Sequence, residues 1–436
     1  MSKCILFAPA FILIAGCSPS APPQPPEPAL PAVEAITYAR DIAPLLQEHC
    51  QSCHQAGGLG PFPLMTYSDA APRAAQIKAA VVSRRMPHGP SVRLDTGCSN
   101  ERTFEGPRRL LQSEIEMFSA WADEGAREGT PGSAPHAREA THHRAVEPDF
   151  LFVNDEQGFF LPPNLNRDVF RRFVIATDFQ SDRFLTGFEA FPGTLDGAGI
   201  NHVVHHVTLF IDASGASRDQ LALFQASAPQ VGGPGFEGDF TYPTSLVGMW
   251  FPGGPPLTMA AGCGIRIPRG ASLVMEVHYG RVTSGVVDKT RLALHLAPQV
   301  TQEIETSLVK NENIFLPAGA KDATVQATRT FPAATTLYAL TPHMHQLGTR
   351  FKVWLSQPGA ETCLADVEWD FEHQGTYRFT TPLNLPAGAS IRTECTYDNS
   401  LGNPNQPSSP PKNVEFGRAS DREMCQLTVA TSTLRQ

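Results

Sequence analysis

The fold is decided by the stretch Val203-Val204-His205-His206-Val207-Thr208-Leu209-Phe210-Ile211, in which apolar and β-branched residues predominate. Such a run is typical of a β-strand. Short apolar runs separated by Gly, Pro, Asn and Asp recur at 173–175, 273–279, 292–296, 337–340 and 351–355. This pattern is typical of antiparallel sandwiches or jelly rolls. Residues 147–436 are too many for one sandwich, so a break at Ala297-Pro298-Gln299 predicts two all-β domains, 147–298 and 299–436.

The bulk composition agrees with a globular, β-rich protein of several domains. At 436 residues the chain is too long for one ordinary core, and its 41% hydrophobic and 18% charged residues exclude a disordered protein. The 39 Pro and 35 Gly residues punctuate strands and turns. The net charge of -9 gives no reason to expect nucleic acid as a partner.

A targeting segment opens the chain. Lys3 precedes a short apolar run, 4–15, which is too short to span a bilayer permanently. The run ends in Ile14-Ala15-Gly16-Cys17, which resembles a bacterial lipoprotein signal and implies a lipid anchor on the Cys17 thiol. A simple secretory signal with a chance cysteine is the alternative. We therefore expect a signal peptide at 1–17, a Pro-rich tether at 18–35, and an exported, periplasmic or cell-envelope lipoprotein anchored to membrane lipid.

Residues 36–131 are predicted to be mostly helical. A short helix is predicted from Tyr38 to Leu46, and a second one over 113–127 has Ile115, Phe118 and Trp121 at helical spacing. Ser113 is the expected N-cap of the second helix. The polar residues 132–146 then predict an interdomain linker.

A CxxCH motif, Cys50-Gln51-Ser52-Cys53-His54, lies in this helical segment. Covalent haem needs two thiols at this spacing to reach its vinyl groups and an imidazole directly after them to bind iron. A disulfide or a zinc-binding CxxC with a chance histidine is the alternative, but export and the preceding helix favour haem. The motif therefore predicts one haem c on Cys50 and Cys53, with His54 as an iron ligand.

The sixth iron ligand is expected further along the chain. Met86 is the predicted ligand, because Pro87 holds the backbone before it extended, which suits a ligand-presenting loop. Met65 and His88 are the competing residues. Residues 36–131 resemble small bacterial cytochromes c, in which a Met-Pro loop supplies the axial methionine, and the resemblance implies a small all-α cytochrome c-like domain.

Histidines in the predicted strands form a second candidate site. His343 and His345 are two residues apart, so on a strand both imidazoles point the same way and can meet one ion. His205 and His206 are adjacent and would face opposite sides of a flat strand. Binding one metal with both requires a bend, a bulge or a strand end. Each pair alone is a weak signal, and jointly they predict metal binding.

Four stretches of the chain resemble the copper type II, ascorbate-dependent monooxygenases, a family that includes peptidylglycine α-hydroxylating monooxygenase and dopamine β-monooxygenase. They are Val204–Phe210, Val277-His278-Tyr279-Gly280, His343-Met344-His345-Gln346-Leu347-Gly348 and Glu423-Met424-Cys425-Gln426-Leu427, in the family's order and at family-like spacing. The resemblance implies two jelly-roll sandwiches that face each other across a solvent-filled cleft, with one copper ion on each.

The resemblance also implies a role for each ligand. The copper ion that only transfers electrons would be bound by His205, His206 and His278. The copper ion at which oxygen is activated would be bound by His343, His345 and Met424. A thioether ligand is soft and favours Cu(I), the state that must react with O₂.

The cysteines remaining after the signal, the anchor and the haem motif are odd in number. In an oxidising compartment most of them should pair and one should be left over. The family resemblance implies a disulfide between Cys395 and Cys425, whereas Cys98, Cys263 and Cys363 have no assignment.

The chain departs from the family where peptide-hydroxylating members hold the substrate carboxylate. Those members carry an Arg two residues before the HxH motif and a Tyr four residues after the methionine, and here the positions are Thr341 and Thr428. Val207 and Ile211 also replace the usual Met and Cys. A peptidylglycine substrate is therefore not expected. His202 is interpreted as a surface residue or a neighbour of the first site, and not as a ligand.

We therefore expect a monooxygenase that hydroxylates an unactivated C–H bond of an unknown organic substrate with O₂. Its electrons would come through the haem from an external one-electron reductant, a periplasmic carrier or an ascorbate-like molecule. A copper-binding or electron-transfer lipoprotein without monooxygenase activity is the alternative. A haem-only protein with degenerate copper sites is disfavoured, because all six expected copper ligands are present.

Overall fold

The computed structural model describes residues 35–51, 53–55, 60–87, 91–92, 98, 104–105, 110–130, 148–154, 156–193, 203–227, 235–237, 244–252, 254 and 256–433. By its internal contacts the chain divides into Met1–Ala35 and Ile36–Gln436. The second unit carries all the helices and strands reported below. Among the residues described, no helix has both the length and the apolar composition needed to cross a bilayer.

Short helices occupy the beginning of the second unit. They are η1 Tyr38–Ile42, α1 Ala43–His49, α2 Tyr67–Ala70, η2 Ala71–Arg73, α3 Ala74–Val82 and α4 Gln112–Asp123. Helix α4 begins one residue before the expected N-cap Ser113, and the Glu114 carboxylate accepts the Leu111 N–H at 2.7 Å. Phe118 and Trp121 of α4 are fully buried against residues of α1 and α3.

The predicted fold class is wrong. Of the described residues 44% are in strands and 16% in helices, and these residues contain no sizeable all-α cytochrome-like domain. Segment 36–131 itself contributes two strands, β1 Ser91–Val92 and β2 Phe104–Glu105, which pair antiparallel with strands near the C-terminus. The helical spacing of 113–127 does not extend through this segment, because prolines and glycines recur between residues 87 and 107 and disfavour helix.

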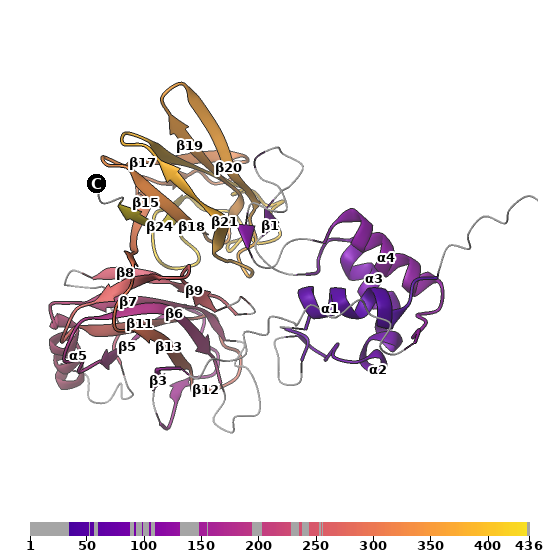
Figure 1. Cartoon of the computed structure of the whole chain (residues 1–436), viewed down its shortest axis with the longest axis horizontal. Coiled ribbons are helices and arrows are strands. Elements are labelled where there is room, and N and C mark those ends of the chain that lie inside the picture. The colour runs from indigo at the N-terminus through magenta and orange to yellow at the C-terminus, as the bar shows by residue number, and fades with distance from the viewer. Residues whose placement is uncertain are drawn as a thin grey trace, which may run out of the picture. The chain divides into compact units, whose positions relative to one another are not determined.

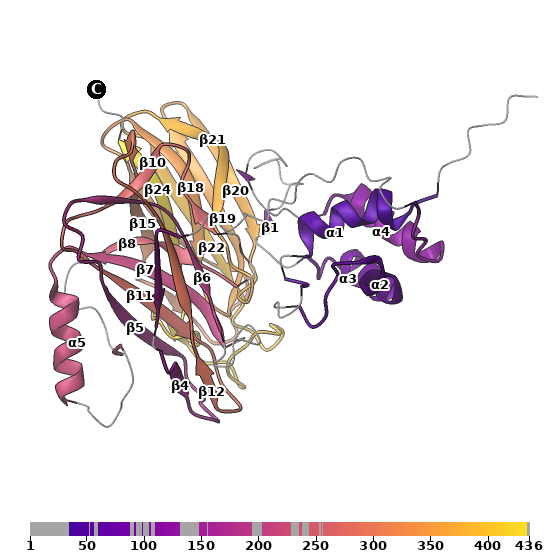
Figure 2. The same cartoon turned by 60° about the horizontal axis from the view of Figure 1, so that its bottom comes forward.

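Two sheets and a short strand pair follow in residues 150–303 (Figure 1). One sheet has the order β14-β10-β6-β13-β3, with β9 on β6, and the other has the order β5-β11-β7-β8. Helix α5 Ala216–Ser227 lies beside β5 (Figure 2). The strands are β3 Phe150–Val153, β4 Phe159–Leu161, β5 Val169–Ala176, β6 Arg183–Phe191, β7 Val204–Asp212, β8 Ser245–Trp250, β9 Leu257–Thr258, β10 Cys263–Ile267, β11 Ser272–Tyr279, β12 Val286–Asp288, β13 Arg291–Ala297 and β14 Gln302–Glu303.

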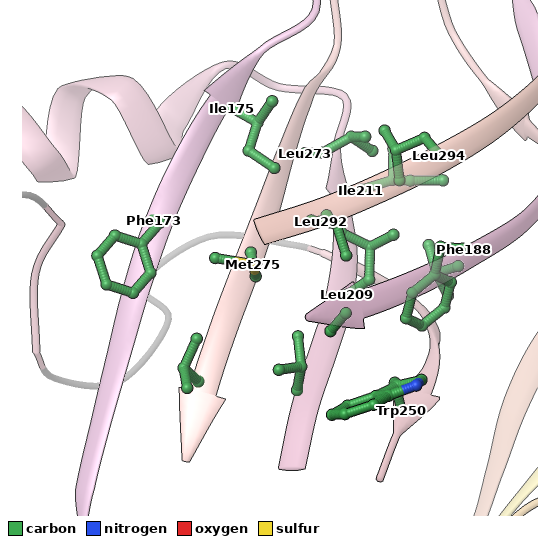
Figure 3. Packing of buried hydrophobic residues seen from close by; sticks show 14 of the residues in the cluster. Phe173, Ile175, Phe188, Leu209, Ile211, Trp250, Leu273, Met275, Leu292 and Leu294 are labelled. Atoms are coloured by element: carbon green, nitrogen blue, oxygen red, sulfur yellow. The ribbon is translucent and has the colours of Figure 1, made fainter. Parts of the chain in front are cut away.

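The core of this part lies between the two sheets, where Phe188 and Leu292 of one sheet pack with Leu209 and Leu273 of the other (Figure 3). On β11 the odd-numbered residues from Leu273 to Tyr279 belong to this core. Because side chains alternate along a strand, the even-numbered residues of β11 project from the opposite face of the sheet. That face carries the first group of histidines.

The remaining strands form two further sheets with a core of their own. Their orders are β1-β20-β19-β22-β17 and β15-β24-β18-β21-β2, and β16 pairs with β23. Fully buried Phe351, Leu337 and Leu427 belong to their shared core. The strands are β15 Glu305–Asn311, β16 Phe315–Leu316, β17 Ala323–Thr330, β18 Thr335–His343, β19 Gly348–Gln357, β20 Ala360–Glu368, β21 Tyr377–Leu385, β22 Ser390–Tyr397, β23 Val414–Glu415 and β24 Cys425–Thr433.

Candidate metal centre

A β-bulge brings three histidines together on one face of the sheet. His278 of β11 pairs with His206 of β7, whereas the next residue, Tyr279, pairs with Val204, so His205 is the extra residue of the bulge. A bulge re-aims the side chain that it carries. His205 and His206 therefore share a side, and one nitrogen from each of the three imidazoles lies within 4.8 Å of the others.

The hydrogen bonds of this first histidine set leave nitrogen lone pairs directed inward. His205 Nε2 donates to the Phe371 carbonyl at 3.1 Å, so its Nδ1 is unprotonated and faces His206 Nδ1 at 3.2 Å. Within the described part of the chain neither ring nitrogen of buried His278 has a hydrogen-bond partner, and its Nε2 lies 3.6 Å from Asp168 Oδ1. A buried imidazole without a partner is costly, and a cation held by the three rings removes that cost.

A second histidine set lies at the end of β18. His343 Nδ1 lies 2.7 Å from Gln374 Oε1, and His345 Nδ1 lies 3.1 Å from the Arg422 carbonyl. Both acceptors fix the proton on Nδ1, which leaves each Nε2 free for a metal. The two ring centroids are 5.1 Å apart.

Met424 lies directly before β24, whose residue Gln426 pairs with His343 at the end of β18. The buried Glu423 carboxylate accepts the N–H groups of His345 at 2.9 Å, Leu347 at 2.7 Å and Met424 at 3.2 Å. Burial raises the pKa of Glu423 to about 8, although these backbone N–H groups act in the opposite direction. One side chain thus ties the methionine to the HxH segment.

The two histidine sets are in contact. The ring centroids of His206 and His343 are 5.6 Å apart, so the expected solvent-filled cleft does not separate these two imidazoles. The loop between β20 and β21 supports both sets, because Phe371 stacks on His205 at 4.4 Å and Gln374 binds His343. Sequence reasoning missed Phe371, Gln374 and Glu423, since no local pattern marks a residue whose partner is distant in the chain.

Burial keeps these imidazoles neutral. Burial, aided by the neighbouring His278, lowers the pKa of His205 to about 3 and that of His343 to about 4. The pKa values of His206 and His345 are also well below the ordinary value, chiefly because both rings are buried. Neutral imidazole is the form that binds a metal, so the set is ready to do so at neutral pH.

The metal-free protein should lose stability on acidification from pH 6.5 towards 4. The unfolded chain takes up protons on these histidines below pH 6.5 while the folded chain does not, which costs about 1.4 kcal/mol per imidazole and pH unit. Glu423, with its raised pKa, contributes with the opposite sign and offsets one histidine. Urea unfolding between pH 6.5 and 5 measures how steeply the free energy of unfolding falls with pH. In the variant His205→Gln/His343→Gln this dependence should be clearly shallower. An equal dependence on pH would contradict the conclusion that these two imidazoles are neutral in the folded protein.

The CxxCH residues lie between α1 and α2. Neither Cys50 nor Cys53 is in a disulfide with a described cysteine, and burial, followed by the proximity of Cys53, raises the pKa of Cys50 to about 12. Buried His54 has its Nδ1 2.9 Å from the Phe62 carbonyl, which leaves Nε2 free to bind iron. A Cβ at Gly60 would lie 2.6 Å from His54 Nδ1, so only glycine fits beside the ring. These features fit an axial imidazole.

Met86 is half-buried, and it lines a small pocket with Val81, Arg84, Pro87, Leu110 and Ile115. This lining includes no described residue of the CxxCH motif, and Met86 as the sixth iron ligand stays a prediction. The competitor Met65 is 39% exposed. His88 and His202 lie outside the described residues, as does Cys17.

Two disulfides join cysteines of the described segments. The Cys395–Cys425 disulfide, which the family resemblance implies, attaches the residue after Met424 to β22. The Cys98–Cys363 disulfide was not predicted from the sequence. Cys263 is the buried free thiol among the remaining cysteines. Thr341 and Thr428, which replace the substrate-binding Arg and Tyr of peptide-hydroxylating enzymes, pair with each other across β18 and β24.

Comparisons with known proteins do not assign the chain. No protein-family model matches it, and no curated protein matches it. Among solved structures, the match to the structure of infectious bursal disease virus Gx strain covers 66% of this chain and 74% of that one, with 9% identity and a TM-score of 0.18. The match to the crystal structure of the STIV MCP covers 60% of this chain and 97% of that one, with 10% identity and a TM-score of 0.20. The match to the structure of PNGF-II covers 65% of this chain and 60% of that one, with 8% identity and a TM-score of 0.21. TM-scores this low carry no argument about function.

Proposed function

We propose that this protein is a copper-dependent monooxygenase that hydroxylates a C–H bond with O₂. The observation that carries the proposal is the convergence of five imidazoles from β7, β11 and the end of β18, four of them buried, in which the outer nitrogens of His205, His343 and His345 are hydrogen-bonded. Imidazole suits copper, and an added thioether favours its reduced state. The four family-like stretches support the same assignment.

The residues divide into two proposed ligand sets. His205, His206 and His278 would hold one copper ion, and His343, His345 and Met424 would hold a second. Bound copper would supply one-electron transfer at the first set and O₂ activation at the second. The balance of the reaction requires two electrons and two protons: one oxygen atom enters the C–H bond and the other leaves as water.

The protein's own contribution is to orient the ligands. The Phe371 carbonyl, Gln374 and the Arg422 carbonyl hold the protons of three imidazoles on the nitrogens that face away from the site. Glu423 fixes the backbone of His345 and Met424. Outer contacts of this kind set the orientation and basicity of metal ligands.

We further propose that a covalent haem on Cys50 and Cys53, with His54 as an iron ligand, relays single electrons to the copper sites. The support is the CxxCH motif and the free Nε2 that the His54–Phe62 contact implies. An external one-electron reductant would supply the haem. Export as a lipid-anchored, periplasmic or cell-envelope protein belongs to the same proposal, since covalent haem and disulfides both suit an oxidising compartment.

The decisive experiment measures copper and haem per chain. Purified protein without its signal segment is reconstituted with copper, and elemental analysis is combined with haem absorbance. We expect two copper ions and one haem per chain. A haem without stoichiometric copper would remove the monooxygenase proposal, and copper without haem would remove only the relay.

A second candidate is a copper-binding or electron-transfer protein without monooxygenase activity. It is favoured by the contact between His206 and His343 and by the Thr341–Thr428 pair in place of known substrate-binding residues. Incubation of the reduced, copper-loaded protein with ¹⁸O₂ and candidate substrates separates the two. Incorporation of one ¹⁸O atom into a product supports the enzyme, and stoichiometric copper with no product from any substrate class supports the carrier.

A further inference from the structure

We infer that Arg418 is a positioning residue that couples the two ligand sets through the segment between β23 and β24. The inference rests on the proposed function, because it assumes that these sets hold copper. Arg418 lies six residues before Met424, yet its guanidinium contacts the sheet that carries His278. Neither a motif nor the family resemblance points to it.

The surface that receives Arg418 is a polar row next to the first histidine set. Glu276 of β11 pairs with Arg172 of β5 and Thr208 of β7, two residues before His278 in the same strand. Glu276 and His278 therefore project from the same face of the sheet. Glu276 is 4% exposed, and Arg172 Nη2 lies 2.7 Å from its Oε2, so the carboxylate has a partner even without Arg418.

Arg418 is a second partner of this carboxylate. Its Nη2 lies 2.7 Å from both Oε1 and Oε2 of Glu276. Its guanidinium also lies over the Phe170 ring at 5.2 Å, and Phe170 in turn stacks on His278 at 4.2 Å. A charged hydrogen bond to a buried carboxylate, combined with stacking, fixes a side chain in one orientation. Arg418 thus packs against the ring that supports a proposed copper ligand.

A backbone contact reinforces the docking. The Ser420 N–H donates to Asp168 Oδ2 at 2.7 Å, and Oδ1 of the same carboxylate lies 3.6 Å from His278 Nε2. Segment 418–420 therefore touches the surroundings of His278 at two points, through Phe170 and through Asp168.

The same segment then continues into the second ligand set. The Arg422 carbonyl contacts His345, the Glu423 carboxylate holds the His345 and Met424 backbones, and Met424 itself is the proposed thioether ligand. Seven consecutive residues, 418–424, thus contact one set at their beginning and supply the other at their end. If Arg418 is released, the backbone that presents Met424 loses its attachment to the first set.

The test uses the full-length mature protein loaded with Cu(I) in competition with a chromophoric chelator, and X-ray absorption to detect the copper–sulfur contribution of Met424. The variants are Arg418→Gln, which removes the charge, and Arg418→Lys, which keeps the charge but not the planar guanidinium that lies over Phe170. Arg266→Gln is the matched control, because Arg266 pairs with Asp182 on an exposed part of β10.

We expect Arg418→Gln to bind the second copper roughly tenfold more weakly, with the first copper retained, in line with other losses of outer support at metal sites. The copper–sulfur contribution should fall at limiting copper, and Arg418→Lys should lie between Arg418→Gln and the wild type. In the metal-free protein, hydrogen exchange of the amides in 417–427 should speed up in Arg418→Gln and not in Arg266→Gln.

The outcomes separate the inference from the proposed function. Wild-type protein that binds no stoichiometric copper overturns the proposed function, and this role with it. Wild-type protein with two copper ions, together with an Arg418→Gln variant of equal second-site affinity and equal exchange in 417–427, overturns only the coupling role. If Arg418→Gln does not fold, Arg418→Lys decides by the same two measurements.

Discussion

Leucine in place of Met424 should lower the copper content of the reconstituted protein from two ions per chain to one. Leucine conserves the volume of methionine, so the substitution removes the sulfur and little else. The remaining ligands, His343 and His345, keep their outer contacts to Gln374 and Arg422. Two imidazoles without the thioether hold Cu(I) less well. The rate of hydroxylation of any substrate should fall by roughly 100-fold or more, because the loss of contacts around a metal lowers activity in this way at other sites.

Met344→Leu is the matched control for this prediction. Met344 stands between the two histidines of the HxH motif, but it is fully buried in the hydrophobic core of the second pair of sheets. Its replacement should therefore change stability slightly and leave both copper ions bound. X-ray absorption should show a copper–sulfur contribution in the wild type and in Met344→Leu, and none in Met424→Leu. An unchanged copper–sulfur contribution in Met424→Leu would remove Met424 from the proposed site.

The local part of the candidate metal centre could be predicted from the sequence. His343 and His345 do come close, but β18 ends at His343, so the expected shared face of a strand does not account for their proximity. The adjacency of His205 and His206, by contrast, required a distortion of β7. The structure supplies that distortion as a bulge at His205. This inference depends only on the alternation of side chains along a strand, which is a property of the backbone.

The supporting residues could not be predicted in this way. Phe371 supports His205 from 166 positions away in the chain, and Glu423 holds the His345 backbone from 78 positions away. Contacts over such separations depend on how the sheets pair and not on local spacing. Arg418 is a similar case, because an arginine in a loop is usually solvated and nothing near it in the sequence indicates a buried carboxylate partner.

The prediction of the fold class was wrong for a related reason. Helical spacing in 113–127 is a local signal and it did identify α4 Gln112–Asp123, but it carries no information on the residues between the helices. There the chain places β1 and β2 on the edges of sheets formed mostly by C-terminal strands. Strands of two residues are too short to show alternation, and their pairing partners, β20 and β21, lie more than 250 residues further on.

This pairing determines how the proposed electron relay is tested. Deletion of 36–131 would remove β1 and β2 from two sheets, so a loss of activity would not identify the haem as its cause. The variant Cys50→Ser/Cys53→Ser is the better choice, because serine retains the size of cysteine and cannot form the thioether bonds to haem. Its haem absorbance should be lost after denaturation and extraction, whereas the wild type should retain it.

In this variant the copper ions should be reduced roughly 100-fold more slowly by a micromolar one-electron carrier. A tethered haem acts at an effective concentration on the order of millimolar, which a free carrier does not reach. Rapid mixing with detection of Cu(II) by electron paramagnetic resonance measures the rate. The control is Cys263→Ser, since Cys263 is a buried free thiol outside the motif. Copper reduction at the same rate in Cys50→Ser/Cys53→Ser and in the wild type would show that electrons reach the copper sites directly, and the haem would then need another role.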